Sequence, residues 1–239
     1  HFPPGSFMIL DNSNSKNYNL SYKKYTSFPC SNIKYLNRAS LYYKIIDNLE
    51  SAVKKRVSGT TERPIGCLLS GGLDSSLIAA LVNKFYKSHE PLQTFSIGLP
   101  GSEDLKYARM VAKHLGTKHN EIILTEDQFF DAIPEVIKTI ESYDTTTIRA
   151  SVGNYLVGKY IKENTNCKVI FNGDGADELM GGYLYFKKAP NEYEYDKECK
   201  RLATRYFKNI FLNSGIPFLS VNKISKSNFF PFKILNIWF

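Results

Sequence analysis

The stretch GCLLSGGLDSS, at residues 66–76, constrains the fold more than any other part of the chain. An apolar run at 65–69 is followed at once by Ser-Gly-Gly, and a segment with apolar residues at helical spacing comes next. This pattern predicts a buried strand, a tight loop and a helix. Glycine tolerates positive φ and has no side chain, so such a loop can approach a charged oxygen closely. Because amides at a helix N-terminus favour an anion, the loop is a candidate phosphate site.

Strand and helix patterns alternate along most of the chain. Strands are expected at 65–69, 93–97, 121–124 and 168–171. Helices are expected at 41–57, 103–115, 126–140 and 148–162, and a further helix is expected to run from the loop at 70–76 to about residue 86. Alternation of this kind implies crossover connections, so the expected fold class is α/β, a parallel sheet with helices on both faces. In such a sheet a ligand binds beyond the carboxyl ends of the strands, which selects the loops at 70–76, 98–104 and 172–178.

The two ends of the chain lack this alternation. Short extended pieces are expected at 6–10 and 18–22, around a turn rich in Asn and Ser. The chain ends in FFPFKILNIWF, for which a buried strand, an interface and an irregular end are all open. If that tail is exposed, its apolar surface predicts a homodimer or aggregation.

Composition narrows the class of protein. With 239 residues and 43% hydrophobic content the chain can form a packed core, and no apolar run approaches the ~18 residues that a membrane span needs. The net charge of +8 permits an anionic partner, but no basic block interleaved with aromatics indicates nucleic-acid binding. The cysteines form no C-x-x-C pair, and the histidines lack metal-ligand spacing and are expected on the surface or in loops. A cytoplasmic protein that binds neither membrane nor nucleic acid is expected.

Acidic side chains accompany the glycine loop. The loop lacks the lysine of G-x-x-x-x-G-K-[ST], but it carries Asp74. A carboxylate beside a phosphate requires a cation between them, for which Mg²⁺ is the natural candidate. A second loop, NGDGADE at 172–178, follows a strand and adds three acids, which a parallel sheet would bring next to the first loop. The pair predicts a nucleotide with Mg²⁺, with ordinary glycine-turn chemistry as the alternative.

Three linked motifs resemble one enzyme family. SGGLDSS is similar to the pyrophosphate loop of the N-type ATP pyrophosphatases, whose fold is the adenine nucleotide alpha hydrolase-like (PP-loop) fold. ESYDTTTIRAS (141–151) and NGDGADELMGGYLYF (172–186) resemble the synthetase domain of glutamine-dependent asparagine synthetases, and 95–122 is similar to the segment between these motifs. The resemblance spans roughly residues 33–195, in the order expected of the family.

The resemblance implies ATP-dependent asparagine synthesis, with ATP cleaved between its α and β phosphates. Aspartate would form a β-aspartyl adenylate and release pyrophosphate, and ammonia, from glutamine in the full-length enzyme, would then displace AMP. The positions matched to the nucleotide are Leu69, Ser70, Gly71, Gly72, Asp74, Ser75, Ser76, Ile97, Gly98, Asn172 and Gly173. Asp74 and Asp177 match the positions that hold Mg²⁺.

The resemblance also assigns a set of catalytic residues. Thr146, Thr147 and Arg149 match the positions around the substrate aspartate and the intermediate. A planar guanidinium suits a carboxylate or phosphate, although an ion pair with Glu141 is the alternative for Arg149. Asp174 stands where many members have glutamate, and it is expected to act as the acid/base partner of ammonia.

The chain departs from the family at both ends. Residues 1–32 are expected to be the end of an N-terminal glutaminase domain and a linker, 33–200 the synthetase domain, and 201–239 an atypical, truncated tail. The tail lacks the acidic and arginine residues of the family's E-x-R-x-P-F-L-D run, so weak or absent activity is expected. A β-lactam synthetase, a tRNA-modifying enzyme and a non-catalytic nucleotide-binding remnant are the alternatives. A tRNA modifier should show an RNA-binding appendage or a cysteine of low pKa.

Overall fold

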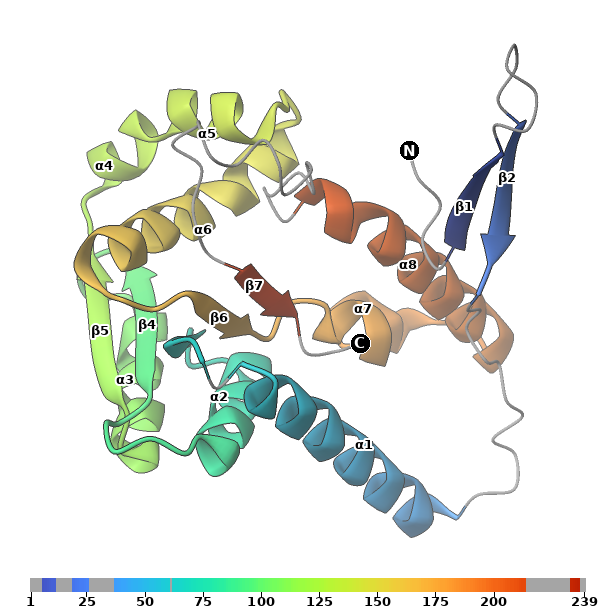
Figure 1. Cartoon of the computed structure of the whole chain (residues 1–239), viewed down its shortest axis with the longest axis horizontal. Coiled ribbons are helices and arrows are strands. Elements are labelled where there is room, and N and C mark those ends of the chain that lie inside the picture. The colour runs from blue at the N-terminus through green and yellow to red at the C-terminus, as the bar shows by residue number, and fades with distance from the viewer. Residues whose placement is uncertain (1–5, 12–18, 26–36, 61, 214–232, 237–239) are drawn as a thin grey trace.

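The structure is a computed structural model that describes residues 6–11, 19–25, 37–60, 62–213 and 233–236. These residues form a two-stranded ribbon and an α/β body built around one larger sheet (Figure 1). The ribbon pairs β1 (Ser6–Asp11) with β2 (Asn19–Lys24) in antiparallel fashion, as expected from the extended pieces near the start of the chain.

The larger sheet has five strands in the order β5-β4-β3-β6-β7. Their bounds are β3 Ile65–Leu68, β4 Gln93–Gly98, β5 Lys118–Ile123, β6 Val169–Asn172 and β7 Lys233–Asn236. Every neighbouring pair is parallel, which confirms the expected parallel sheet. Part of the apolar tail is therefore a strand at the edge of the sheet, and the rest of FFPFKILNIWF lies outside the described residues.

The helices expected from the sequence occur in the expected order, with one correction, and further helical segments that were not expected follow β6. The helices are α1 (Arg38–Ser58), α2 (Leu73–Phe85), α3 (Glu103–Leu115), α4 (Glu126–Asp131), α5 (Ile133–Ile140), α6 (Thr145–Asn164), α7 (Ala176–Met180), the 3₁₀ helix η1 (Leu184–Lys188) and α8 (Glu192–Asn213). The single helix expected at 126–140 is wrong, because Pro134 lies in the first turn of α5 and lacks the amide that would continue α4. Within the described ranges, no helix has the length and hydropathy of a membrane span.

Helices cover both faces of the sheet, as predicted. Side chains alternate along a strand, so Val169 and Phe171 of β6 pack with α1, α2 and α3 on one face, whereas Ile170 packs with α6 on the other. A strand buried on both faces is continuously apolar, which explains the short apolar runs in the sequence. In Figure 1, α4 and α5 lie beyond α6 on this second face.

The connections bring three helix N-termini to one edge of the sheet. Helices α2 and α3 begin directly after β3 and β4, at the carboxyl ends of these strands. Helix α6 leads into the start of β6, so its opposite end, at Thr145, also lies toward the carboxyl edge. The fold thus collects the three loop regions from which a ligand site was predicted.

Candidate nucleotide-binding site

The loop between β3 and α2 is closed by two of its serines. The hydroxyls of Ser70 and Ser75 lie 2.9 Å apart, and the amide of Ser70 donates to Ser75 Oγ at 3.2 Å. The Ser75 hydroxyl also lies 3.3 Å from Gly72 O, its acceptor. Gly72 is the N-cap of α2 and has no side chain to cap it. The turn is therefore small and polar, with hydroxyls and backbone amides at a helix N-terminus.

Gly71 fits its position for two reasons. Its φ of 83° lies in the left-handed region, which favours glycine. A Cβ at this position would also lie 2.5 Å from Ala108 N and 2.6 Å from Tyr107 Cβ, so the loop rests directly on the backbone of α3. The sequence predicted a close approach to an oxygen, and the structure adds a close approach to a helix.

The acidic loop lies against the start of α2. A Cβ on Gly173 would be 2.9 Å from both Asp74 C and Ser75 N. Only glycine permits this approach between backbones, since real Cβ contacts are longer. The contact confirms the expectation that the parallel sheet brings the loops at 70–76 and 172–178 together.

Within the acidic loop, Asn172 orients the first carboxylate. Its Nδ2 donates to Asp174 Oδ2 at 2.7 Å, and Asn172 is buried while Asp174 is exposed. Gly175 turns the chain with a φ of 97°. The Asp177 carboxylate then lies over Gly182, where a side chain would collide with it. The loop thus presents the exposed carboxylate of Asp174, whereas the carboxylate of Asp177 lies against the turn at Gly182.

Unpaired buried oxygens gather at the same edge of the sheet. Three buried side-chain oxygens lack a hydrogen-bond partner among the described residues: Ser76 Oγ, Ser102 Oγ and Asn172 Oδ1. Ser76 lies in the first turn of α2, Ser102 at the N-cap of α3 and Asn172 at the end of β6. Buried polar atoms are normally paired, so their grouping at the carboxyl edge indicates a polar ligand or ordered water there. The sequence did not single out Ser102 as a site residue, although it lies within the loop at 98–104.

The residues expected near adenosine end two central strands. Gly98 approaches α3, because a Cβ there would lie 2.7 Å from Ser102 Oγ and 3.1 Å from Leu105 Cγ. Ile97 precedes it at the end of β4 and is partly buried. The Leu69 side chain is buried in the core and its amide donates to Phe95 O at 2.8 Å, so the fold already uses both groups.

The first turn of α6 holds the residues matched to the amino-acid substrate. Asp144 caps the helix, with Oδ2 accepting from Thr147 N at 2.8 Å and from Thr147 Oγ1 at 2.7 Å. Thr146 and Arg149 are exposed. Asp144 was missed in the sequence, although an aspartate three residues before a threonine is a recognisable capping signal.

The alternative interpretation of Arg149 is wrong. In the part of the chain that the structure describes, no ion pair joins Arg149 to Glu141. Glu141 instead ends α5 with a φ of 51°, in the left-handed region. The Arg149 guanidinium is therefore not committed to that carboxylate.

The carboxylates suit Mg²⁺ better than an all-protein metal cage. Among the described residues, no group of three or more His, Cys, Asp and Glu side chains is placed to hold a metal. Mg²⁺ typically uses one or two carboxylates together with substrate phosphates. Asp74 lies in contact with the loop that carries Asp174 and Asp177, which fits that kind of site. The assignment of the ion to Asp74 and Asp177 stays a prediction.

His119, whose side chain is only 10% exposed, joins β4 to β5 through hydrogen bonds, contrary to the expectation that the histidines lie on the surface or in loops. His119 Nδ1 lies 2.9 Å from Thr94 Oγ1, and its Nε2 lies 3.0 Å from Ser96 Oγ. Burial lowers the pKa of His119, partly opposed by Glu121, which Arg109 holds through two hydrogen bonds of 2.7 Å. These hydrogen bonds link β5 to the strand that carries Ile97.

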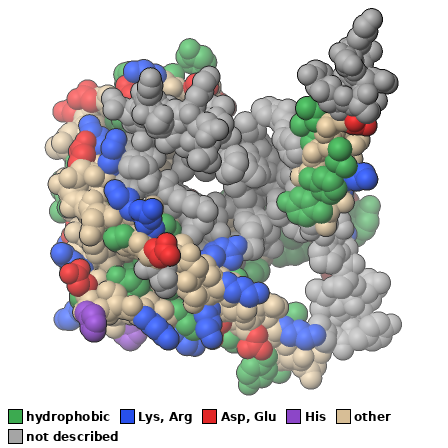
Figure 2. Space-filling view, viewed as in Figure 1, with side chains coloured by type: hydrophobic (Ala, Val, Ile, Leu, Met, Phe, Trp, Pro, Cys, Tyr) green, Lys and Arg blue, Asp and Glu red, His purple; other side chains and the backbone are tan. Residues whose placement is uncertain are grey.

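The three cysteines that the structure describes show no sign of a reactive thiol. Cys67, Cys167 and Cys199 are unpaired, and burial raises the pKa of all three thiols. A reactive thiol needs a lowered pKa, so these residues give no support to a tRNA-modifying enzyme. Figure 2 shows Lys and Arg side chains spread among other residues on one face, without a single basic patch among the coloured atoms.

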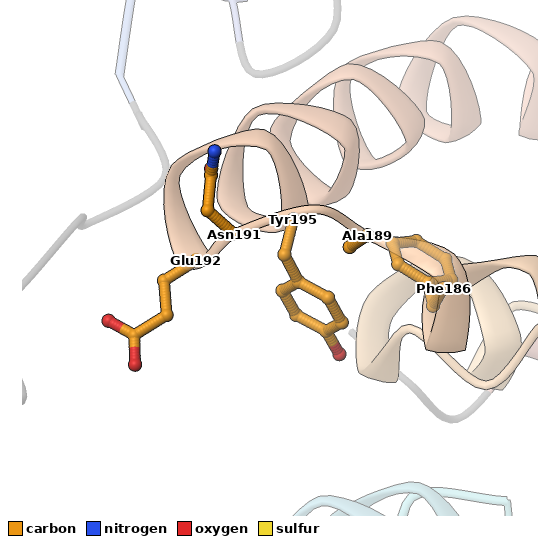
Figure 3. Close-up of a pocket in the computed structure, with 5 residues that line it drawn as sticks. All are labelled: Phe186, Ala189, Asn191, Glu192 and Tyr195. Carbon is orange, nitrogen blue, oxygen red and sulfur yellow. The ribbon is translucent and has the colours of Figure 1, made fainter.

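Two pockets lie outside the loops described above. One, of about 350 Å³, is formed where η1 meets α8 and is lined by Phe186, Ala189, Asn191, Glu192 and Tyr195 (Figure 3). The ring centroids of Phe186 and Tyr195 are 5.0 Å apart, so the end of the motif at 172–186 serves aromatic packing. The other, of about 410 Å³, is lined by Pro134, Ile137, Lys138, Glu141 and Tyr143, near the start of α6.

Comparison of the sequence with known proteins identifies one family. Residues 44–217 match the sequence model of the asparagine synthase family. The chain is 51% identical over 161 residues to the glutamine-hydrolysing asparagine synthetase of Bos taurus and 51% identical over 160 residues to that of Homo sapiens. These matches cover 66% of this chain and 28% of each relative. Among solved structures, the ammonia-dependent NAD synthetase of Campylobacter jejuni is similar with a TM-score of 0.42 and 18% identity, covering 76% of this chain and 81% of that chain.

Proposed function

Because the chain belongs to the asparagine synthase family, we propose that it forms the ATP-dependent synthetase region of an enzyme that makes asparagine from aspartate and ammonia. The reaction proceeds through β-aspartyl-AMP and releases pyrophosphate and then AMP. The observation that carries the proposal is the contact of Gly173 with the backbone of Asp74 and Ser75. This contact puts the serine and glycine turn, which suits an anion, beside acids that suit a cation.

Each loop then has a role in the first step. The pyrophosphate-binding residues are Ser70, Gly71, Gly72, Ser75 and Ser76, and the adenosine side is formed by Leu69, Ile97, Gly98, Asn172 and Gly173. Asp74 and Asp177 would hold Mg²⁺, which supplies charge neutralisation at phosphate oxygens when bound. Backbone amides and hydroxyls placed before the reaction stabilise the charge on the leaving group without reorganisation.

The second step uses α6 and the acidic loop. Thr146, Thr147 and Arg149 hold aspartate and its adenylate, with the guanidinium suited to a carboxylate or phosphate. Asp174 is exposed and held by Asn172, so it is available to take a proton from ammonia as the new amide bond forms. The names of the relatives state glutamine hydrolysis, and we extend this to the source of ammonia in the whole protein.

The remaining parts of the proposal concern context. Residues 1–32 are the end of a glutaminase domain with its linker, 33–200 the synthetase domain and 201–239 its tail. The unpaired cysteines support a reducing compartment such as the cytoplasm. The exposed apolar side chains of the β1–β2 ribbon support a homodimer.

The test is aspartate-dependent release of pyrophosphate. The chain is incubated with ATP, Mg²⁺ and ammonium chloride, with and without aspartate, and pyrophosphate, AMP and asparagine are measured. Asp74→Asn is expected to abolish release, while Asp47→Asn, at an exposed position on α1, is the matched control that keeps it. Release that does not depend on aspartate, or no binding of MgATP, would contradict the proposal, whereas binding of MgATP without turnover would support the alternative of a non-catalytic nucleotide-binding domain.

A further inference from the structure

The hydroxyl hydrogen of Thr147 is fixed by Asp144. Thr147 Oγ1 lies 2.7 Å from Asp144 Oδ2, and the same oxygen accepts from Thr147 N at 2.8 Å. An ionised carboxylate has no hydrogen to give, so the hydroxyl is the donor in this pair. The backbone of Asp144 is itself held, since its amide donates to Ser142 Oγ at 3.2 Å.

The bond to Asp144 determines which kind of further hydrogen-bond partner the Thr147 hydroxyl can have. A hydroxyl has one hydrogen and two lone pairs, and here the hydrogen is already used. Thr147 Oγ1 therefore accepts from a further partner, and it cannot donate to a phosphate or carboxylate oxygen without leaving Asp144. The negative charge of Asp144 beside it favours a cationic donor in addition.

The substrates of the proposed reaction differ in this respect. ATP phosphates and both carboxylates of aspartate are acceptors, whereas the α-ammonium group of aspartate is a cationic donor. The ammonium group therefore suits a hydroxyl that can only accept a hydrogen bond and that lies beside a carboxylate. Arg149, two residues further along α6, carries the opposite charge and suits the anionic parts of the same molecule.

We propose that Asp144 is a positioning residue that presents Thr147 Oγ1 as an acceptor to the α-ammonium group of the amino-acid substrate. The inference rests on the proposed function, because that function identifies the first turn of α6 as the aspartate site. It adds the substrate atom that this turn recognises, and it predicts that the site distinguishes an amino acid from a plain dicarboxylate.

The test compares aspartate with succinate, which has the same carboxylates and no ammonium group. Binding of each is measured calorimetrically to the chain with Mg²⁺ and α,β-methylene ATP. Thr147→Val removes the hydroxyl at nearly constant shape, and Asp144→Asn keeps an oxygen that caps α6 while removing the charge. Both are expected to weaken aspartate binding by about tenfold or more and to leave succinate binding unchanged. Thr147→Ser should restore the preference, and Thr145→Val, at an exposed neighbour, is the control.

The outcomes separate this inference from the proposed function. Three results would each overturn it. They are equal losses of affinity for aspartate and succinate, an unchanged ratio of the two affinities in Thr147→Val, and no binding of aspartate by the unaltered chain. Selective aspartate binding without pyrophosphate release would keep the inference and contradict the proposed reaction. Release of pyrophosphate, together with an unchanged ratio of aspartate affinity to succinate affinity in both variants, would support the proposed reaction and contradict this inference. Thermal unfolding of each variant separates a loss of recognition from a loss of fold.

Discussion

Gly173 packs on the backbone of Asp74, and a Cβ on the glycine would lie 2.9 Å from the Asp74 carbonyl carbon. Gly173→Ala is therefore expected to push the two loops apart and to destabilise the fold by about 1–3 kcal/mol, as overpacking usually does. ATP binding should fall more than stability alone explains, because the loop at 172–178 moves away from the helix start. The measurements are urea unfolding and calorimetric binding of MgATP.

A glycine in open surroundings provides the control for Gly173. In α6 a Cβ on Gly153 would have no atom within 4 Å, and its φ is not positive. Because alanine favours a helix interior, Gly153→Ala is expected to stabilise the protein by about 0.5–1 kcal/mol. If both substitutions had the same small effect, the contact between the loops would not constrain the site.

A second prediction separates conformation from crowding at Gly71. Gly71 and Gly116 both have positive φ, but a Cβ on Gly71 would lie 2.5 Å from Ala108 N, whereas one on Gly116 would have nothing within 4 Å. Gly116→Ala should cost only the left-handed conformation, about 1 kcal/mol. Gly71→Ala should cost clearly more and should also weaken ATP binding. Equal unfolding midpoints for the two variants would mean that the loop can move off α3.

The sequence was most informative where apolar periodicity and end signals agree. Helix α3 was predicted at 103–115 and has these bounds, because Gly116 takes the left-handed conformation that ends a helix. Strand β5 was predicted too short, because Lys118, His119 and Asn120 interrupt its apolar pattern. The His119 side chain is nevertheless only 10% exposed, because hydroxyls of β4 satisfy both of its ring nitrogens. Such pairing between strands cannot be read from the sequence of one segment.

The sequence predicted which loops form the candidate site better than it predicted the contacts within those loops. The motifs located the loops at 70–76 and 172–178, and the parallel order of strands predicted that they meet. The closure of the first loop by Ser70 and Ser75 depends on the φ of Gly71, which the sequence does not specify. The sequence did not single out Asp144, because aspartate is common in turns for several reasons besides capping a helix.

His119 predicts a dependence of stability on pH. Burial lowers the pKa of His119 below its ordinary value near 6.5, so the unfolded chain binds more protons than the folded one between the two values. The free energy of unfolding should therefore fall as the pH drops below about 6.5, and level off below the folded pKa. His119→Gln should flatten this part of the profile in urea unfolding from pH 7.5 to 5. An equal slope in both proteins would assign the sensitivity to other groups.

The β1–β2 ribbon predicts self-association through one face. The register places Met8 opposite Tyr22 and Leu10 opposite Leu20, and these side chains are 40%, 53%, 54% and 56% exposed respectively. Because alternate residues of a strand share a face, the four form one apolar surface, and an isolated two-stranded ribbon is marginal in water.

The double substitution Leu10→Thr and Leu20→Thr keeps strand propensity while removing apolar area from this surface. It is expected to shift the sedimentation coefficient toward the monomer at concentrations where the unaltered chain associates. The opposite face carries Ile9 across from Ser21, so Ile9→Thr is the matched control and should change association little. Association that persists in the double variant would place the contact elsewhere on the chain. If the Ile9→Thr control dissociates equally, the substitutions have destabilised the ribbon as a whole rather than one face.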